Sequence, residues 1–511
     1  MMNKPLQPMR IPVVFSEEDN AATSLTPTMA TARAAQQRWA CVPIKHRLRL
    51  VRKLRQLIAE NARKLAEASA KTRSRPISEA LAAEVLPLAE ACRFLELNAE
   101  RILRPQRFGI RGRPIWLAAV QSEIRREPCG VILIIGPENY PLFLPGVQLL
   151  QALMAGNTVL LKPGVGGTGA ALALRELILR AGFPPDILTL LPESTDAARE
   201  VIAAGPDKVL FTGSAVTGEN ILAQLAPQLI PATMELSGCD AAIVRADADI
   251  DLAVNALVFG LSLNNGATCL SPKRVFVHRS IATELEGRLS QSFGLSSASQ
   301  HSSTHNPEAR TLVDEAIALG AHFIIGGIGP DGSLTTPMVL AGASASSRLL
   351  NADIFLPIIS IVTVADDDEA VLRANDCPFA LGMSIYSRDE SAARSLAARV
   401  NAGFVTINDL IVPTADARLP FGGRARSGFG VTRGAEGLLE LTKPKVVTTT
   451  RGTFRPAFAK PHPGDETLFE SYLHLVHGRG GIARWNALVS IIQSLLARRK
   501  SSAHIYENSR H

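Results

Sequence analysis

The chain lacks the closely spaced cysteines that a disulfide framework or a zinc site requires. Its 511 residues include six cysteines, and these are scattered along the sequence at Cys41, Cys92, Cys129, Cys239, Cys269 and Cys377. Disulfide-rich domains and zinc sites instead place cysteines in pairs or at short fixed intervals. We therefore expect neither disulfides nor a metal site, and we expect a reducing compartment.

Long apolar segments are lacking as well. No stretch of about 18 uncharged apolar residues occurs, and the start of the chain lacks the apolar run of a secretory signal. Aromatic residues make up only 5% of the chain, and no basic stripe alternates with them as a nucleic-acid platform would require. Much of the net charge of +7 is local, at 45–55 and 498–500. We expect a cytoplasmic protein without a nucleic-acid partner.

What the chain does have is 46% hydrophobic residues, enough for several large cores. Residues 30–102 repeat apolar positions every three or four residues, which predicts a helical layer. From residue 129 onward, β-branched runs such as "GVILIIG" alternate with amphipathic helical segments, in two series that share the junction 229–238. Parallel strands covered by helices on both faces produce this alternation. We therefore predict an α/β protein with two doubly wound lobes and a cleft between them.

Three polar residues occupy positions that suggest chemistry. Cys269 stands among small and polar neighbours in "NNGATCLSPKR", although a free cysteine is usually a small buried hydrophobe. Glu235 lies in the apolar strand "PATMELSG", where burial would raise its pKa toward that of a general base; a structural ion pair is the alternative. Asn139 follows the strand "GVILIIG" in a turn, so it could donate a hydrogen bond into the cleft or serve only as turn chemistry.

Two segments resemble phosphate-binding loops. Gly164–Gly169, "GVGGTG", matches the dinucleotide pattern literally, but no acidic residue follows about 20 positions later at the end of a strand. The segment 211–218, "FTGSAVTG", also runs from strand to helix, and its Gly213, Ser214 and Gly218 would let backbone donors approach a phosphate. A plain helix start with Ser214 as N-cap is the alternative for the second loop.

The segments quoted so far, with others, resemble the aldehyde dehydrogenase superfamily. Seven motifs occur in the family's order over roughly residues 30–450: "GPENYP", "NTVLLKPG", "FTGSAVTG", "MELSG", "NNGATC", "IFLP" and "LPFGGRARSGFG". The separation of 34 residues between Glu235 and Cys269 also fits. The hairpin before "EPCGVI" is most similar to the class 3, fatty and aromatic aldehyde branch.

The resemblance implies an enzyme that oxidises an aldehyde to a carboxylic acid with NAD or NADP. Cys269 would be the thiolate nucleophile, Asn139 would hold the oxyanion, and Glu235 would activate the water that hydrolyses the thioester. The pyrophosphate would lie at Gly213, Ser214 and Gly218. The segment Gly164–Gly169 would then match the dinucleotide pattern without binding the cofactor. The remaining cofactor contacts would come from Lys162, Asp353 and Phe355.

Several positions depart from the family pattern. Val165 stands where a carboxylate usually binds the adenosine ribose, Asp353 replaces a longer glutamate, and Leu356 replaces a glycine. A preference for NAD over NADP therefore does not follow. A coenzyme-A-dependent acyl-transferring enzyme, or a binding or scaffold protein on this fold, remains an alternative.

The resemblance also implies a division of the chain and a homodimer. The predicted parts are a helical part of the cofactor-binding domain (1–106), an oligomerisation hairpin (107–128), a dinucleotide-binding domain (129–234), a catalytic domain (235–440), an oligomerisation strand (441–451) and a C-terminal extension with an amphipathic helix (452–511). The apolar stripe of that helix precedes Arg498, Arg499 and Lys500. We expect it to pack on protein or to lie on an anionic membrane surface.

Overall fold

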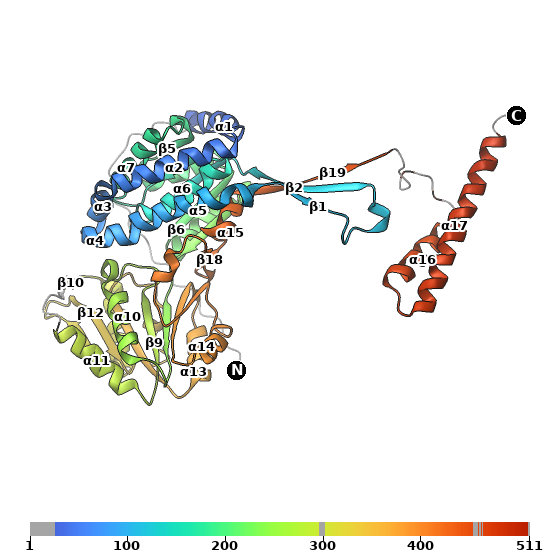
Figure 1. Cartoon of the computed structure of the whole chain (residues 1–511). Helices are drawn as coiled ribbons and strands as arrows, with labels where there is room; N and C mark the ends of the chain where they lie inside the picture. The colour runs from blue at the N-terminus through green and yellow to red at the C-terminus, as the bar shows by residue number, and fades with distance from the viewer. Residues whose placement is uncertain (1–25, 296–301, 453–457, 459–460, 462, 509–511) are drawn as a thin grey trace. The chain divides into compact units, whose positions relative to one another are not determined.

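The computed structural model describes residues 26–295, 302–452, 458, 461 and 463–508 (Figure 1). The chain forms two compact units. The larger unit extends to Arg107 and resumes over Glu123–Val447, and the smaller unit contains Phe108–Ser122 and the residues from Thr448 onward.

A layer of helices precedes the first sheet in the larger unit. The amphipathic helix α2 buries Val51, Leu54 and Ile58, which recur at the helical repeat, and it packs on α5 and α7. The bounds of the layer are α1 (Thr26–Ala40), α2 (Ile44–Glu60), α3 (Ala62–Ala70), α4 (Ile77–Ala80) and α5 (Leu86–Leu103).

The first sheet has six strands in the order β18-β7-β6-β3-β4-β5. All neighbours are parallel except β18 and β7. Ile132 and Ile134 of β3 pack in a core with α6 and α7, whereas Val131 and Leu133 face α8 and α9. Burial on both faces explains the continuous apolar runs. The bounds are β3 (Val131–Ile135), α6 (Phe143–Ala155), β4 (Thr158–Lys162), α7 (Thr168–Ala181), β5 (Leu188–Leu190), α8 (Thr195–Ala203), β6 (Lys208–Gly213), α9 (Ala215–Leu225), β7 (Ala232–Leu236) and β18 (Gly428–Phe429).

The second sheet repeats this design with the order β10-β12-β13-β9-β8-β15-β16, and β11 also pairs with β12. Ala241 and Ile243 of β8 face the core of α12, α13 and α14, and Ala242 and Val244 face that of α10 and α11. The prediction of two doubly wound α/β lobes is confirmed. The bounds are β8 (Asp240–Val244), α10 (Ile250–Ser262), β9 (Pro272–His278), α11 (Ala282–Leu295), β10 (Ser302–Thr304), α12 (Pro307–Ala318), β11 (His322–Ile328), β12 (Leu334–Ala341), β13 (Ile358–Val364), α13 (Asp367–Asn375), β15 (Gly382–Tyr386), α14 (Glu390–Ala397) and β16 (Phe404–Ile407).

The predicted boundaries differ from the sheets at two places. The expected start of a catalytic domain at residue 235 falls inside β7, so Glu235 belongs to the first sheet. The chain also returns to this lobe late, because β18 pairs with β7 and α15 (Gly434–Glu440) contacts α5 and α6. Strand pairing over long sequence separation is not visible in a local pattern.

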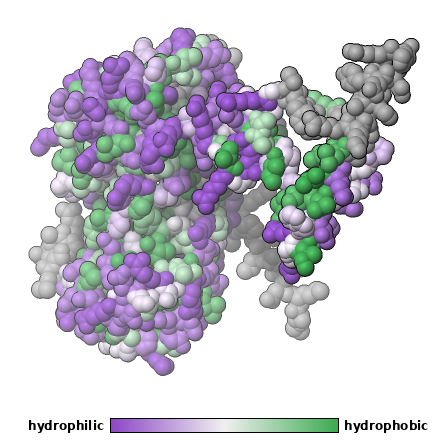
Figure 2. Space-filling view, turned by 45° about the vertical axis from the view of Figure 1, so that its right-hand side comes forward, coloured by the Kyte–Doolittle hydropathy of each residue, from purple (hydrophilic) through white to green (hydrophobic). Residues whose placement is uncertain are grey.

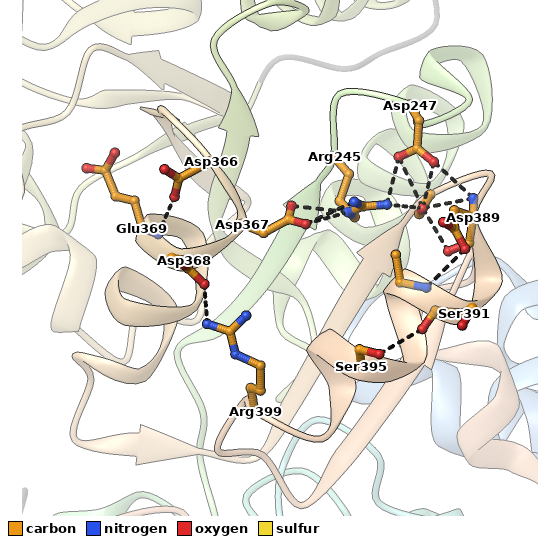
Figure 3. A network of polar contacts seen from close by, with 12 residues as sticks. Arg245, Asp247, Asp366, Asp367, Asp368, Glu369, Asp389, Ser391, Ser395 and Arg399 are labelled. Atoms are coloured by element: carbon orange, nitrogen blue, oxygen red, sulfur yellow. Dashed lines mark hydrogen bonds and ion pairs between the residues drawn. The ribbon is translucent and has the colours of Figure 1, made fainter.

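A polar network fixes helices α13 and α14 to the second sheet (Figure 3). Asp366 accepts a hydrogen bond from the Glu369 N–H and so caps α13, and Asp389 caps α14 in the same way at Ala392. Arg245, which follows β8, pairs with Asp367 at the start of α13. The helix α13 is therefore held in place at its N-terminus.

Two short antiparallel strands, β14 (Phe379–Ala380) and β17 (Arg424–Ala425), pair with each other. The predicted hairpin and the predicted late strand are β1 (Gln106–Phe108), β2 (Val120–Pro128) and β19 (Thr442–Thr450), which form a sheet in the order β1-β2-β19. Their role in oligomerisation stays a prediction.

The C-terminal extension contains two helices rather than the one expected. α16 (Asp465–His477) packs on α17 (Gly481–Asn508), and Ser471 donates a hydrogen bond to Ser490 at 2.8 Å. The predicted apolar stripe is exposed on this pair and appears as green patches in Figure 2, with exposed fractions of 81% for Ile482 and 65% for Trp485. The side chains of Arg498–Lys500 lie outside the described residues. No helix in the described part of the chain has the length and apolar character to cross a membrane.

Candidate active site

A cavity of about 350 Å³ in the larger unit is lined by side chains from both lobes. Seven of the nine predicted site residues line it: Asn139, Gly213, Ser214, Glu235, Cys269, Asp353 and Phe355. Lys162 and Gly218 are not among the lining residues. The other lining residues are Arg73, Pro137, Glu138, Leu144, Thr212, Leu236, Ser237, Leu381 and Phe421.

Cys269 lies between a tight turn, η6 (Leu263–Gly266), and strand β9. Asn264, Asn265 and Gly266 all have positive φ angles, so the chain reverses sharply before the cysteine. Only glycine fits at position 266, because the Cβ atom of any other residue would lie 2.5 Å from Pro357. The close approach brings the Cys269 turn against the segment that carries Asp353 and Phe355.

Hydrogen bonds tie this turn to the Asn139 loop. The Asn139 amide nitrogen donates to the Ala267 carbonyl at 2.9 Å, and the Asn264 amide nitrogen donates to the Asn139 carbonyl at 2.9 Å. Tyr140 and Thr268 share a hydrogen bond of 2.5 Å between their hydroxyls. An amide nitrogen carries two hydrogens, so Asn139 retains a second donor for a developing oxyanion.

Lys273 connects the two loops of the second lobe. Its Nζ donates to the carbonyls of Gly266 at 3.1 Å and Leu356 at 3.0 Å. Burial lowers the pKa of this lysine to about 8, and nearby acidic groups such as Cys239 and Asp353 oppose the shift. The ammonium therefore positions the Cys269 turn relative to the Asp353 segment.

Glu235 is buried on strand β7 and accepts hydrogen bonds from three side chains. Its Oε2 accepts from Thr212 at 3.1 Å and from Gln148 at 3.4 Å, and its Oε1 accepts from Thr432. Burial raises the pKa of Glu235, and the charge of Arg433 and the three hydrogen bonds oppose this shift. A carboxyl group with a raised pKa is suited to act as a general base near neutral pH.

Arg433 places a buried positive charge beside the two reactive groups. Its guanidinium lies between the rings of Phe143 and Phe421, at 4.8 Å and 4.5 Å from their centroids, and donates to the Thr414 carbonyl at 2.5 Å. Its charge favours the ionised forms of both Glu235 and Cys269. Arg433 therefore balances two acidic groups in a site of low polarity.

Burial raises the pKa of Cys269 to about 12, and the charges of Asp240 and Glu235 add to this effect. The Arg433 charge and a hydrogen bond from the Leu270 N–H act in the opposite direction. In the ligand-free site Cys269 is therefore mainly a neutral thiol.

The second predicted phosphate loop opens into the cavity. Gly213 ends β6, and Ser214 caps α9 by accepting a hydrogen bond from the Thr217 N–H at 3.3 Å. At Gly218 a Cβ atom would meet Leu236 at 2.7 Å, and its predicted place at a phosphate stays a prediction. The glycine lets α9 pack closely on β7, and the exposed N–H groups come from the start of the helix.

Asp353 offers an unsatisfied acceptor at the same end of the cavity. Its Oδ1 is buried without a hydrogen-bond partner, and the neighbouring Ser237 hydroxyl donates to the Gly213 carbonyl at 3.2 Å. Burial raises the pKa of Asp353, and the nearby Ser237 hydroxyl and the Lys273 charge oppose the shift. An orphaned acceptor beside a helix N-terminus fits a ribose hydroxyl next to a pyrophosphate.

In the turn Gly164–Gly169, which matches the dinucleotide pattern, a side chain of the protein already accepts the backbone hydrogen bonds. Glu193 accepts hydrogen bonds at 2.8 Å from the N–H groups of Gly166 and Thr168, at the start of α7. Burial raises the pKa of Glu193, but these hydrogen bonds and the Lys162 charge outweigh it, so the pKa lies below its usual value. A carboxylate already occupies the place that a phosphate would take.

Sequence reasoning missed Gln148, Thr432, Arg433, Lys273 and Glu193. Gln148 had a local signal, because it is a polar residue in the apolar helix α6. Lys273 lies four residues after Cys269, and Thr432 and Arg433 follow the motif at 419–430, but the contacts of these residues and of Glu193 form only on folding. Among the described residues, no three His, Cys, Asp or Glu side chains gather closely enough to hold a metal ion.

Comparisons with known proteins show the family of the chain. The model of the aldehyde dehydrogenase family matches residues 6–447. The chain is 30% identical to 4,4'-diapolycopene aldehyde oxidase of Methylomonas sp, with 88% of this chain and 86% of that protein covered. It is also 30% identical to a putative succinate-semialdehyde dehydrogenase [NADP(+)] of Mycolicibacterium smegmatis, with 86% of each chain covered.

Solved structures show the same relationship. An NAD-dependent aldehyde dehydrogenase from Sinorhizobium meliloti is similar with a TM-score of 0.77 at 29% identity, and 84% of this chain and 88% of that chain are covered. A betaine aldehyde dehydrogenase from Staphylococcus aureus, in complex with NAD+, has a TM-score of 0.76 at 26% identity, over 85% of this chain and 89% of that chain. The chain belongs to the aldehyde dehydrogenase family.

Proposed function

We propose that the protein oxidises an aldehyde to a carboxylic acid with NAD or NADP as hydride acceptor. The observation that carries this proposal is the convergence of Cys269, Glu235 and Asn139 on one cavity whose other end holds the N-terminus of α9. A thiol, a carboxyl with a raised pKa and an amide donor are the groups that oxidation through a thioester requires.

Each residue takes one role in the reaction. The sulfur of Cys269 attacks the aldehyde carbon, and the Asn139 amide and the Cys269 N–H hold the resulting oxyanion. Because Cys269 is a neutral thiol at rest, its proton must leave on attack; the proton passes to solvent water, and the Arg433 charge favours the thiolate. After hydride loss leaves a thioester, Glu235 takes a proton from the water that hydrolyses it.

The residues present fit a nicotinamide dinucleotide. The first N–H groups of α9, with Gly213 and Ser214, would hold the pyrophosphate, and Asp353 would accept from a ribose hydroxyl. Phe355 would border the nicotinamide, and Lys162 the adenosine end. The dinucleotide supplies the hydride acceptor when bound. With Val165 in the place of the usual carboxylate, NAD and NADP both remain candidates.

The substrate we favour is an uncharged, hydrophobic aldehyde, in keeping with the predicted class 3 resemblance. The apolar side chains Leu144, Leu381 and Phe421 line the cavity, and Leu381 and Phe421 pack in the same cluster as Cys269. Arg73, a cation in the lining, is paired with Glu138 at 2.9 Å, so its charge is countered. The relative named a diapolycopene aldehyde oxidase supports the same substrate class.

A panel of aldehydes tests the proposal. Wild type and Cys269→Ala are assayed with each cofactor on aldehydes that range from long-chain aldehydes to succinate semialdehyde. We expect acid formation by the wild type on apolar aldehydes and none by the variant. Reduction of NAD or NADP by Cys269→Ala would overturn the proposal, and acyl-coenzyme A formation after addition of coenzyme A would favour the acyl-transferring alternative.

We further propose a cytoplasmic homodimer that pairs through the hairpin β1-β2 and strand β19. These elements carry exposed apolar side chains. Ile110 and Trp116 lie in the connection between β1 and β2, and Val446 lies on β19. Light scattering of wild type and of Val446→Lys tests this, and we expect the variant to shift to monomer. A monomeric wild type would contradict the proposal.

We propose that the exposed stripe of α16 and α17 allows peripheral contact with an anionic membrane. The predicted stripe on α17 includes the exposed Ile482, Trp485 and Ile492, and basic residues lie nearby in the sequence. The exposed Phe469 and Leu473 of α16 add to it. Flotation with anionic and neutral liposomes, with and without residues 465–511, tests it. We expect flotation of the full chain with anionic liposomes alone, and no flotation would leave protein packing as the explanation of the stripe.

A further inference from the structure

A buried ion pair behind the Asn139 loop has no role in the reaction just described. Arg75 and Glu84 form this pair, and their side chains are 1% and 0% exposed. Glu84 lies in the π-helical turn η2 (Leu81–Val85) between α4 and α5, and Arg75 precedes α4 (Figure 1). Such a turn interrupts the regular hydrogen bonding of a helix and is frequent near functional sites. The contacts of the pair connect this helical layer with the candidate active site.

Glu84 binds the backbone that follows Asn139. One carboxylate oxygen accepts a hydrogen bond from Arg75, and the other accepts from the N–H groups of Leu142 at 2.7 Å and Phe143 at 3.1 Å. These N–H groups stand at the start of α6, where a negative charge is favourable because the donors have no partner within the helix. Glu84 therefore fixes the chain between Asn139 and α6.

Arg75 contacts the side chain that joins the two loops of the site. Its guanidinium lies 5.3 Å from the centroid of the Tyr140 ring, and Tyr140 directly follows Asn139. The Tyr140 hydroxyl shares a hydrogen bond of 2.5 Å with Thr268, the residue before Cys269. A cation is attracted to the face of an aromatic ring. Arg75 therefore stabilises the position of the tyrosine between the loops.

Glu79 of α4 extends the ion pair to the turn before Cys269. Its Oε1 lies 4.0 Å from Nη1 of Arg75 and accepts a hydrogen bond from the Asn264 N–H at 3.1 Å. Asn264 is the first residue of positive φ in that turn, and its amide nitrogen donates to the Asn139 carbonyl at 2.9 Å. One group of charges therefore contacts both loops.

We propose that Glu79, Arg75 and Glu84, which we call the Glu-Arg-Glu bridge, are positioning residues for the aldehyde chemistry. The bridge holds the Asn139 loop through Glu84 and the Cys269 turn through Glu79, so that the Asn139 amide and the Cys269 N–H point at the same oxyanion. This inference rests on the proposed function. A buried ion pair adds little net stability, because loss of hydration offsets the attraction. The bridge should therefore affect kcat more than stability, since small displacements of reacting groups slow a reaction strongly.

Glu79 is the member of the bridge that can be changed with the least risk to the fold. Its side chain is 20% exposed, whereas removal of Arg75 or Glu84 would leave an unpaired charge in the interior. Glu79→Ala removes the acceptor of the Asn264 N–H, and Glu79→Gln keeps an acceptor oxygen in its place. Glu90→Ala is the matched control, because Glu90 is an exposed glutamate of α5.

Steady-state kinetics test the positioning role. We expect Glu79→Ala to lower kcat about tenfold at an unchanged cofactor KM, because one hydrogen bond to a charged group is lost. Glu79→Gln should stay within about threefold of wild type, and Glu90→Ala should equal it. The value of kcat is referred to folded protein, which circular dichroism measures. An unchanged kcat in Glu79→Ala, an equal loss in Glu79→Gln, or a rise in cofactor KM at constant kcat would overturn the proposal.

A double-mutant cycle tests whether the bridge acts through the oxyanion donor. In Asn139→Ala, the further change Glu79→Ala should lower kcat less than about threefold, because the donor that the bridge positions is already absent. A further loss of about tenfold would show independent action and contradict the positioning role.

Hydrogen exchange separates this inference from the proposed function. Mass spectrometry follows amide exchange in peptides that cover 264–269 of the full-length protein without substrate. We expect Glu79→Ala to speed exchange there about tenfold and Glu90→Ala to leave it unchanged. Unchanged protection in Glu79→Ala would overturn the bridge even in an active enzyme. Faster exchange in a protein without dehydrogenase activity would leave the bridge standing and contradict the proposed function alone.

Discussion

At the chemical end of the cavity the Glu235 carboxylate and the Asn139 amide are already hydrogen-bonded, whereas at the cofactor end Asp353 keeps a buried oxygen without a partner. Glu235 accepts three hydrogen bonds, and Asn139 is tied to the Cys269 turn. The difference indicates that the chemical end is preorganised before any ligand arrives, while the cofactor end becomes satisfied only on binding. Substitutions at the first end should change kcat, and those at the second should change KM.

Among these substitutions, Asn139→Ala should have the largest effect on kcat. Loss of one oxyanion donor lowers kcat by about 10²–10³-fold, and the KM for the cofactor should stay nearly unchanged. Steady-state kinetics with the best aldehyde of the panel measure both values. A rise in cofactor KM at constant kcat would place Asn139 at the wrong end of the cavity.

The ionisation of Cys269 gives a test without substrate. The thiolate is the reactive form, and with a pKa of about 12 its fraction should increase about tenfold per pH unit between about pH 7 and 9. Alkylation of Cys269 by iodoacetamide, followed by peptide mass spectrometry, measures this slope. A rate that is independent of pH over this range would mean that the ligand-free site already holds a thiolate.

Asp353→Ala should act mainly on the cofactor. Removing the acceptor for a ribose hydroxyl should raise the cofactor KM about tenfold, since a hydrogen bond to a charged group is lost. Asp314→Ala on the exposed surface of α12 is the matched control and should change nothing. A loss confined to kcat would remove the distinction between the two ends.

Glu193→Ala should have the smallest effect on kinetics. The cofactor KM should change less than about twofold, and the free energy of unfolding should fall by about 1 kcal/mol because α7 loses a carboxylate at its N-terminus. Ser214→Ala, which removes the cap of α9, should raise the cofactor KM more. If Glu193→Ala instead tightened cofactor binding, the Gly164–Gly169 turn would be a phosphate site that Glu193 blocks.

The fold and the central site residues can be predicted from the sequence because strands that are buried on both faces leave a local pattern. The runs of β3 and β8 are apolar at every position because both faces are buried, so the two lobes could be recognised locally. Cys269, Glu235 and Asn139 stand out as polar groups at the ends of, or inside, such runs. The order of their motifs along the chain supports the resemblance to the aldehyde dehydrogenase family, and that resemblance assigns the three residues to one site.

The residues that tune the site could not be predicted in the same way. Arg433 reaches the site because β18 pairs with β7 across nearly 200 residues, and Lys273 does so because Gly266 permits a close approach to Pro357. Gly218 shows that a glycine in a motif can also serve helix packing, because a Cβ atom there would meet Leu236. Tertiary pairing, which no local pattern encodes, decides these roles.

The most direct test of the central claim is the mass of the enzyme during turnover when water activation is removed. Glu235→Gln is mixed with an aldehyde and the cofactor, quenched in acid and measured as the intact protein and as peptides. We expect a mass increase equal to the aldehyde less two hydrogens, located on the peptide of Cys269 and released by hydroxylamine. Reduced cofactor without an adduct, or an adduct on another residue, would contradict it.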